Sequence, residues 1–139
     1  MVDSSALGAS GEPFVLDVER GKLREFARAA FAPVPTDERP VAPPTFLTTA
    51  FHWQSEASDP WEQVKMEPSR GLHAEQEFVF HGPPPRAGDR LIGTSRISAI
   101  YEKTNRQGKT LTFVEMVTEF HDGSGRLVAE TKLTGVETS

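Results

Sequence analysis

The stretch Val41-Ala-Pro-Pro-Thr-Phe-Leu-Thr-Thr-Ala-Phe-His-Trp53 decides the fold of this chain. Pro43 and Pro44 suit the first turn of a helix, because φ is already set there and the missing N–H would have no partner. Apolar residues recur at steps of four, four and three residues, at Ala42, Phe46, Ala50 and Trp53. Two more, Leu47 and Phe51, lie on the remaining surface of the predicted helix. A helix that is apolar nearly all round is a buried helix. The stretch therefore predicts a buried helix over residues 43–53.

The last third of the chain alternates apolar and polar residues, a period typical of strands. This pattern predicts strands over 90–102, 110–121 and 126–137. The glycine-containing loop 103–109 and the turn sequence Asp122-Gly-Ser-Gly125 separate them, which indicates a three-stranded antiparallel meander. Along the first strand the alternation places one set of residues on a common face: Leu91, Gly93, Ile97, Ala99 and Tyr101.

Upstream, the sequence predicts two further strands and a surface helix. Residues 71–81 are a strand that the triple proline at 83–85 must end, and residues 13–18 are a short edge strand. Residues 19–31 carry apolar side chains at helical spacing opposite charged ones, which is typical of an amphipathic surface helix. Residues 61–66 are ambiguous and compatible with a short strand. Helices ahead of an antiparallel meander indicate the α+β class, with a sheet that curls round the buried helix.

Composition limits the class of protein. At 139 residues the chain is long enough for one domain with its own core. Residues 1–12 are small and polar, without a basic start or an apolar run, and predict a flexible leader ahead of a domain over 13–139. No apolar run of about 18 residues indicates a membrane span, and the net charge of −5 argues against a nucleic-acid partner. The lack of cysteine excludes disulfides and thiol nucleophiles and is compatible with a cytoplasmic location.

Six stretches carry a resemblance to a known family: Val18-Glu-Arg-Gly-Lys-Leu-Arg-Glu-Phe-Ala-Arg28, Val41-Ala-Pro-Pro-Thr-Phe46, Leu72-His-Ala-Glu-Gln-Glu-Phe78, Pro85-Arg-Ala-Gly-Asp-Arg-Leu91, Tyr101-Glu-Lys103 and Leu111-Thr-Phe113. In order and spacing they resemble the MaoC-like dehydratases, in particular the N-terminal-type domain of fungal fatty-acid synthase dehydratase regions and mycobacterial hydroxyacyl-thioester dehydratase subunits. The resemblance implies a single hot-dog domain, an antiparallel sheet wrapped around one buried helix. It also implies a cytoplasmic protein that acts on or holds acyl thioesters of coenzyme A or acyl carrier protein, and that pairs with a second such domain.

Active members of the resembled family hydrate a trans-2-enoyl thioester, or run the reverse dehydration, with an aspartate and a histidine five residues apart. This pair stands in a Gly-Asp-x-Asn-Pro-x-His motif before the buried helix, because one water must be oriented, deprotonated and added across a conjugated double bond. The corresponding stretch here, residues 31–39, contains Asp37, but Ala42 stands five residues on and no histidine lies between Phe31 and Phe51. The comparison with the family motif therefore predicts no catalytic residue.

We expect the substrate to contact the start of the buried helix and a distant loop. The backbone N–H groups of Thr45 and Phe46 are candidates to polarise a thioester carbonyl. Phe46 and Phe51 are candidates to line an acyl tunnel, because ligand sites are largely apolar. A substrate carried by coenzyme A or a carrier protein also brings phosphates. Arg106 and Lys109, in the loop 103–109, contact either these phosphates or a carrier-protein surface, or they only keep the loop solvated.

The histidines allow both functional and structural interpretations. His73 and Glu75 lie two apart on a predicted strand, hence on one face. They form either an acid/base pair or a structural motif, with His73 hydrogen-bonded across a dimer or to the linker. His52 is predicted to cap the end of the buried helix, and His81 and His121 to be solvated beside turns. No pair of histidines has metal-ligand spacing, so we predict no metal and no cofactor.

The function predicted from the sequence is binding of an acyl thioester by the non-catalytic subunit of an (R)-specific enoyl-thioester hydratase or 3-hydroxyacyl dehydratase. Its partner is a second copy or a catalytic MaoC-like subunit. Two alternatives remain open. One is a self-sufficient enzyme, either a hydratase or an acyl-CoA thioesterase in which Asp37, Glu38 or Glu75 directs water at the carbonyl. The other is a non-enzymatic lipid-binding module.

Overall fold

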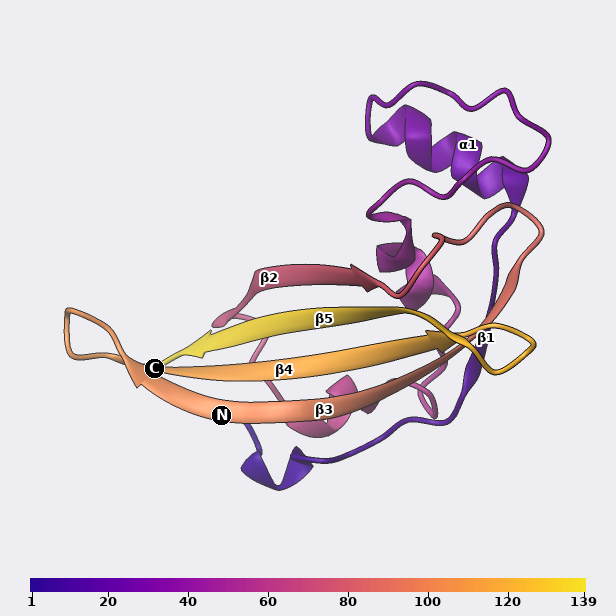
Figure 1. Ribbon diagram of the computed structural model, residues 1–139. Coiled ribbons are helices and arrows are strands. Elements are labelled where there is room, and N and C mark those ends of the chain that lie inside the picture. The colour runs from indigo at the N-terminus through magenta and orange to yellow at the C-terminus, as the bar shows by residue number, and fades with distance from the viewer.

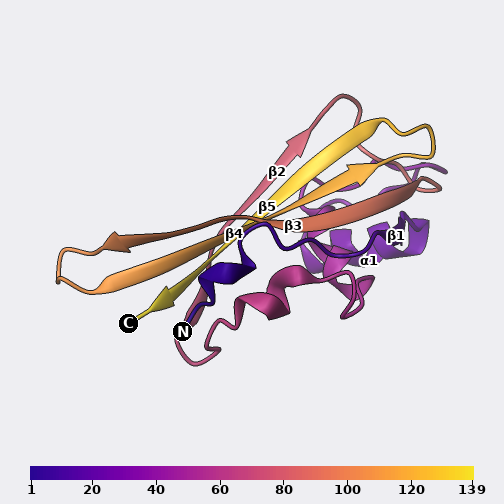
Figure 2. The same ribbon diagram turned by 90° about the horizontal axis from the view of Figure 1, so that it is seen from below.

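The computed structural model describes residues 1–139 as one antiparallel sheet of five strands, with the helical segments gathered on one face (Figures 1 and 2). The strands are β1 (Phe14–Asp17), β2 (Gly71–Phe80), β3 (Arg90–Thr104), β4 (Thr110–His121) and β5 (Leu127–Thr138). The helical segments are α1 (Arg20–Ala29) and the short 3-10 helices η1 (Ser4–Ala6), η2 (Phe46–His52) and η3 (Pro60–Val64). None of these helices has the length and apolar character needed to cross a bilayer. The predicted α+β class and hot-dog architecture are confirmed.

The strands lie in the order β1-β3-β4-β5-β2, so β3, β4 and β5 form the predicted meander. Register pairs Thr104 with Thr110 at the end of the β3–β4 hairpin, where Gly108 adopts a φ of 80° that other residues rarely take. The long strands curve together across the molecule (Figure 1). β2 is an outer strand with β5 as its one neighbour, so its second edge carries no strand.

The central helix is shorter and less buried than the sequence predicts. η2 begins at Phe46 and is a 3-10 helix, so side chains three apart lie above one another. Leu47 and Ala50 are buried on one line of this helix, whereas Phe51 lies on the solvent line and is 63% exposed. Trp53 follows the last turn and is 37% exposed. The prediction of a helix buried all round was therefore wrong, because it assumed the period of an α-helix.

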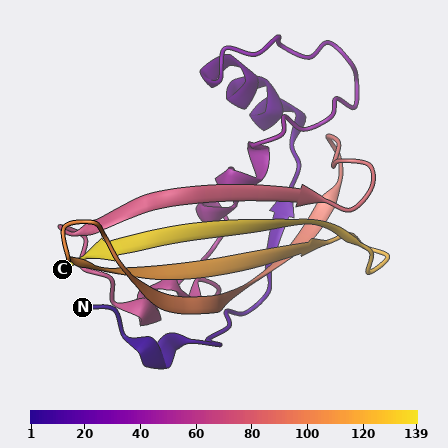
Figure 3. The same cartoon turned by 60° about the vertical axis from the view of Figure 1, so that its left-hand side comes forward.

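α1 confirms the predicted surface helix, with Leu23 and Ala27 buried against the core. The helix ends at Ala29, two residues before the predicted limit. Phe31 adopts a φ of 55° and its side chain is 97% exposed, so it does not extend the apolar face of the helix. A left-handed residue ends a helix, because it turns the chain away from the helix axis. The chain then loops past α1 before it enters η2 (Figure 3).

A bulge in β3 interrupts the predicted alternation. The register shifts between Ile97 and Ala99, and a one-residue slip moves all later side chains to the opposite face. Ile100 consequently packs against the buried cluster in place of Ala99. Tyr101 lies on the other face, where its hydroxyl donates a hydrogen bond to Glu115 Oε1 at 3.1 Å. Burial and this bond raise the pKa of Tyr101.

Residues 1–12, predicted as a flexible leader, pack along the sheet. The N–H of Gly8 donates to the carbonyl of Ile97 at 3.0 Å, and the N–H of Gly11 donates to the carbonyl of Ser95 at 2.9 Å. Ala6 of η1 belongs to a second buried cluster beneath β3 and β4, and Val2 and Ala9 pack against this cluster. The segment therefore continues the line of β1 along the edge of β3, in contrast to the free leader that we predicted.

The ambiguous stretch 61–66 lies within and after η3, not in a strand. The carboxylate of Asp59 accepts a hydrogen bond from the Trp61 N–H at 3.0 Å, which caps the helix start. The Trp61 ring then lies against Gly135 of β5, where an added β-carbon would meet the ring at 2.7 Å. A glycine in this strand therefore makes room for the aromatic ring, because it has no side chain of its own.

Candidate functional site

An apolar pocket of about 430 Å³ lies between α1 and η2. Its hydrophobic lining comes from both helices and the residue after η2: Phe26, Ala29, Phe46 and Trp53. Its polar lining comes from the same elements: Lys22, Glu25, Thr49 and His52. The volume falls within the range of small-molecule sites, which is about 300–1,000 Å³. We take this pocket as the candidate site and call it the helix pocket.

The periods of the two helices explain why these residues meet. On α1 the lining residues lie at i, i+3, i+4 and i+7, which is one face of an α-helix. On η2 they lie at i, i+3 and i+6, which is one line of a 3-10 helix. The rings of Phe26 and Phe46 join the two faces, edge to face, with 5.6 Å between their centroids.

The polar groups of the helix pocket are not joined in an acid–imidazole pair. The carboxylate of Glu25 accepts a hydrogen bond from Lys22 Nζ at 3.0 Å, and this contact raises the pKa of Lys22. The Thr49 hydroxyl donates to the carbonyl of Phe46 at 2.8 Å. The His52 ring lies against Phe51, with 3.9 Å between ring centroids. The pocket thus offers apolar walls and separate polar groups.

Of the predicted contacts near the central helix, the helix pocket includes Phe46 alone. Thr45 immediately precedes η2 and is exposed. Phe51 is 63% exposed and lies on a different line of the helix from the pocket residues. The Phe46 N–H donates to the carbonyl of Pro43 at 3.0 Å, so it is already occupied. The prediction that this N–H polarises a thioester carbonyl therefore finds no support in the geometry.

His73 and Glu75 do not share a face of the sheet, contrary to the prediction. The register of β2 shifts between them, with His73 opposite Gly135 and Glu75 opposite Thr134. The intervening Ala74 is the extra residue of a bulge, which reverses the alternation. His73 Nε2 instead lies 3.1 Å from the backbone oxygen of Glu75. The two side chains therefore form no acid/base pair with each other.

Arg106 and Lys109 are exposed on the β3–β4 hairpin, at the end of the sheet opposite α1 (Figures 1 and 3). Asn105 Oδ1 shapes this turn, because it accepts the N–H groups of Gln107 and Lys109 at 2.9 and 3.0 Å. β4 alone, at 12 residues, spans about 40 Å between the two ends. The structure therefore does not bring these cations to the helix pocket.

The remaining histidines also differ from their predicted settings. His52 lines the pocket, and it makes no hydrogen bond to the helix carbonyls that it was predicted to cap. His81 is exposed, as predicted, but its Nε2 also lies 2.7 Å from Glu130 Oε2, a partner that was not predicted. This pair joins the residue after β2 to β5, and neither residue lines the helix pocket. His121, at the end of β4, is half-buried.

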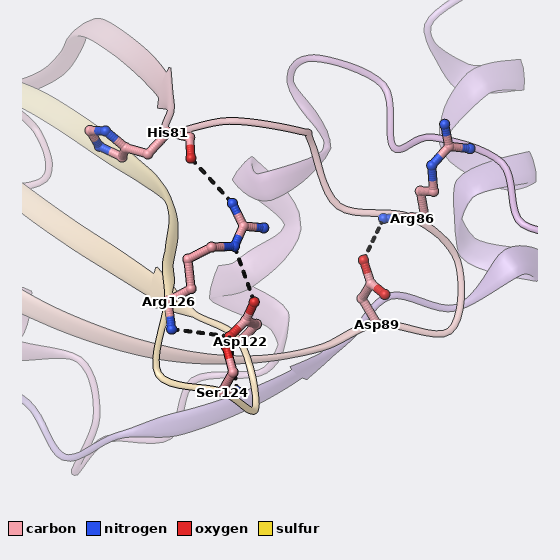
Figure 4. Close-up of polar contacts among 6 residues, drawn as sticks. All are labelled: His81, Arg86, Asp89, Asp122, Ser124 and Arg126. Carbon is pink, nitrogen blue, oxygen red and sulfur yellow. Dashed lines mark hydrogen bonds and ion pairs between the residues drawn. The ribbon is translucent and has the colours of Figure 1, made fainter.

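Polar contacts hold the loops together at the α1 end of the sheet (Figure 4). Asp122 accepts hydrogen bonds from the Ser124 hydroxyl at 2.7 Å and from Arg126, and the Ser124 bond is the main reason that its pKa falls to about 2. Arg126 Nη1 also donates to the carbonyl of His81 at 3.2 Å. Nearby, Asp89 accepts the Arg86 N–H at 2.8 Å. These charged groups stabilise turns and are already paired.

The stretch that resembles the family's catalytic motif carries no paired catalytic groups. Asp37 lies exposed in the loop between α1 and η2, and it takes part in no ion pair. Ala42, five residues on, is buried in the main core. Sequence reasoning missed the pocket residues Glu25 and His52. His52 lies six residues after Phe46 on one line of the 3-10 helix, and Glu25 lies next to Phe26 on the lining face of α1.

Comparisons with known proteins agree with this fold. Residues 5–131 match the family described as FAS1-like, dehydratase domain region. A UPF0336 protein of Streptomyces avermitilis is 34% identical over 95% of this chain and 93% of its own length. A chain of the C-terminally truncated HadBC (3R-hydroxyacyl-ACP dehydratase) complex from Mycobacterium tuberculosis superposes with a TM-score of 0.71 and 26% identity. The match covers 96% of this chain and 99% of that one.

A MaoC-like dehydratase of known structure superposes equally well, with a TM-score of 0.71 and 25% identity. The match covers 96% of this chain but 42% of that longer chain. One hot-dog domain of this size therefore corresponds to part of the larger dehydratase. The protein described here is a member of the FAS1-like dehydratase region family and has the hot-dog fold of the MaoC-like dehydratases.

Proposed function

We propose that this chain is the non-catalytic, acyl-thioester-holding subunit of an (R)-specific enoyl-thioester hydratase or 3-hydroxyacyl dehydratase. The observation that carries the proposal is the helix pocket, which has apolar walls but no joined acid–imidazole pair. Its volume of about 430 Å³ suits the acyl part of a thioester. The similarity to a chain of the HadBC dehydratase complex supports a role within such an enzyme.

The arrangement of polar groups argues against hydration by the pocket itself. Addition of water to an enoyl thioester needs a base and an acid within hydrogen-bond reach of the reacting atoms. Glu25 is bonded to Lys22 on the helix surface, and the His52 ring lies tilted against Phe51. The joined pair His81–Glu130 lies elsewhere, between β2 and β5. A partner subunit that carries the aspartate and histidine would supply the missing chemistry.

The sheet has one edge suited to such a partner. The segment 8–17 covers the edge of β3, through β1 and the hydrogen bonds of Gly8 and Gly11. β2 leaves its outer edge open over 10 residues, and such an edge is a template for pairing with another chain. Leu72, on this strand, is 62% exposed. We therefore propose that the outer edge of β2, together with the exposed side chain of Leu72, contacts the catalytic subunit.

A pocket-filling variant tests whether the acyl chain occupies the helix pocket. Ala29→Trp places an indole in the cavity and leaves the core untouched, because Ala29 is an exposed lining residue. In a complex with a catalytic MaoC-like subunit, we expect hydration of trans-2-decenoyl-CoA to show a KM raised about tenfold or more. Assembly of the complex, measured by gel filtration, should be unchanged.

Ala30→Trp is the matched control, because Ala30 is exposed next to Ala29 but does not line the pocket. This variant should keep the KM of the unmodified complex. Equal kinetics for the two variants would show that the acyl chain binds elsewhere, and the proposed holding role of the helix pocket would be lost.

A self-sufficient enzyme is the second candidate, because Glu25 and His52 line the same pocket. Substrate binding would then have to bring the two side chains together around a water. In that case the purified chain alone would hydrate an enoyl thioester or hydrolyse an acyl-CoA. Both Glu25→Gln and His52→Ala would abolish this turnover without loss of folding, since both residues are exposed.

A further inference from the structure

Arg20 and Arg24 face a second recess on α1, on a different face of the helix from the helix pocket. This recess has a volume of about 500 Å³ and lies between the first turns of α1 and the loop 34–36. Its remaining lining is Gly21, Val34, Pro35 and Thr36, so no carboxylate lines it. Neither arginine takes part in an ion pair or donates a side-chain hydrogen bond.

Arg20 and Arg24 place two free guanidinium groups on one helix face, whereas several other arginines of the chain are paired with carboxylates. The net charge is −5, and Arg39, Arg90 and Arg126 each lie within 3.3 Å of an aspartate oxygen. Arg20 and Arg24 are four residues apart, a spacing at which like charges are neighbours and repel. An anion in the recess would relieve this repulsion. The planar fork of arginine suits phosphate oxygens, and the Thr36 hydroxyl offers one more donor.

We propose that Arg20, Arg24 and Thr36 bind a phosphate ester at the end of the pantetheine arm whose acyl group lies in the helix pocket. This inference rests on the proposed function, because it assumes a thioester substrate. α1 has 10 residues, so it is about 15 Å long and about 10–12 Å across with side chains. The two hollows lie on different faces of this one short helix, so an extended pantetheine arm must pass round α1 to reach both.

In this proposal the phosphate binds in the recess on α1, and not at the β3–β4 hairpin. Arg106 and Lys109 lie beyond the far end of β4, about 40 Å of strand away from α1. A pantetheine arm does not cover this distance. The same phosphate chemistry has two sources, the nucleotide part of coenzyme A and the phosphodiester that joins pantetheine to a carrier protein. Thioesters with and without the nucleotide distinguish these sources.

Three decanoyl thioesters test the site by their affinities for the purified full chain. Decanoyl-N-acetylcysteamine has no phosphate, decanoyl-4′-phosphopantetheine has the phosphate shared by both carriers, and decanoyl-CoA adds the nucleotide. Each lost charge-assisted contact should weaken binding about tenfold. The double variant Arg20→Glu/Arg24→Glu should therefore bind decanoyl-CoA about 100-fold more weakly and bind decanoyl-N-acetylcysteamine as before. Circular dichroism should be unchanged, because both arginines are exposed and glutamate is a good helix former.

The affinity for decanoyl-4′-phosphopantetheine identifies which phosphate the arginines bind. If the double variant weakens decanoyl-4′-phosphopantetheine as strongly as decanoyl-CoA, the arginines bind the phosphate that both carriers share. If it weakens decanoyl-CoA alone, they bind the nucleotide part. Either result supports the phosphate site. Equal affinities of the double variant and the unmodified chain for all three probes would overturn it.

Arg96→Glu is the matched charge control, since Arg96 is exposed on β3 opposite Val117 and has no ion pair. It should leave all three affinities unchanged. Loss of decanoyl-CoA affinity in Arg106→Glu/Lys109→Glu, but not in the α1 variant, would assign the phosphate to the hairpin and overturn the inference. If decanoyl-N-acetylcysteamine fails to bind the unmodified chain, the proposed function itself fails. Arginine-dependent binding of free coenzyme A would in that case still support the phosphate site.

Discussion

Glu137 is a buried carboxylate that ties the loop before β2 to the end of β5. Its side chain is 6% exposed, and it accepts the Glu67 N–H at 2.7 Å and lies 3.5 Å from Arg70 Nη2. The bond from the Glu67 N–H is the main reason that the pKa of Glu137 falls below its ordinary value of 4.5. A charged group this enclosed is kept by its partners, because burial alone would favour the neutral form.

The variant Glu137→Gln tests this contribution. It should lower the free energy of unfolding at pH 7 by about 1–3 kcal/mol, because the charge-assisted bond is weakened inside the protein. Since the folded pKa is depressed, the stabilisation is fully present above about pH 4.5 and is lost as the pH falls through the folded pKa. Urea unfolding curves of the two proteins should therefore converge in acid. Parallel curves at every pH would contradict the account.

Thr134 offers a prediction of the opposite sign. It is 3% exposed, and its hydroxyl oxygen is the buried side-chain polar atom without a hydrogen-bond partner. Thr134→Val removes the hydroxyl and keeps the shape, so we expect a gain of about 1 kcal/mol in the free energy of unfolding. Chemical denaturation would check this. A destabilised variant would show that the hydroxyl has a partner in solution, such as a bound water.

At the scale of single elements, periodicity located the strands and α1 but did not detect changes of period. β4 spans the predicted residues 110–121, because its alternation has no interruption. Bulges at Ala74 and at Ser98 reverse the facing of later residues, and no glycine or proline in the sequence marks either position. η2 has three residues per turn, which placed His52 in the pocket and Phe51 in solvent.

The two phenylalanines of η2 should therefore differ sharply. Phe46 is 2% exposed and packs on Phe26, so Phe46→Ala should cost about 3–5 kcal/mol of stability. Phe51 is 63% exposed, and Phe51→Ala should change the stability of the isolated chain by less than about 0.5 kcal/mol. Thermal unfolding of both variants checks the contrast. Equal losses would mean that η2 is buried all round, as the α-helical period predicts.

At the scale of the whole molecule, the N-terminal segment closes one edge of the sheet. The main core of 13 buried residues and a second cluster of 5 lie apart on the same side of the sheet, and η1 covers the smaller one. The small polar residues of this segment are typical of a flexible leader. The sequence is misleading here because backbone groups make most of the contacts that hold the segment on the sheet. Sequence patterns do not reveal backbone contacts of this kind. They also did not identify the residues of α1 that line the helix pocket.

Deletion of residues 2–11 should expose the second cluster and the edge of β3. The loss of backbone hydrogen bonds and apolar contacts should cost on the order of 3 kcal/mol. The exposed strand edge should also promote self-association. Urea denaturation and light scattering would measure the two effects. A shortened chain as stable and as monodisperse as the full chain would contradict the role of the segment.

The most direct test of the proposed division of labour is the hydration of trans-2-decenoyl-CoA by the purified chain, measured alone and together with a catalytic MaoC-like subunit. The proposal predicts no turnover above the uncatalysed rate for the chain alone, because its pocket has no joined acid and imidazole. The mixture should hydrate the substrate faster than the catalytic subunit does by itself. Steady turnover by the isolated chain would contradict the non-catalytic role.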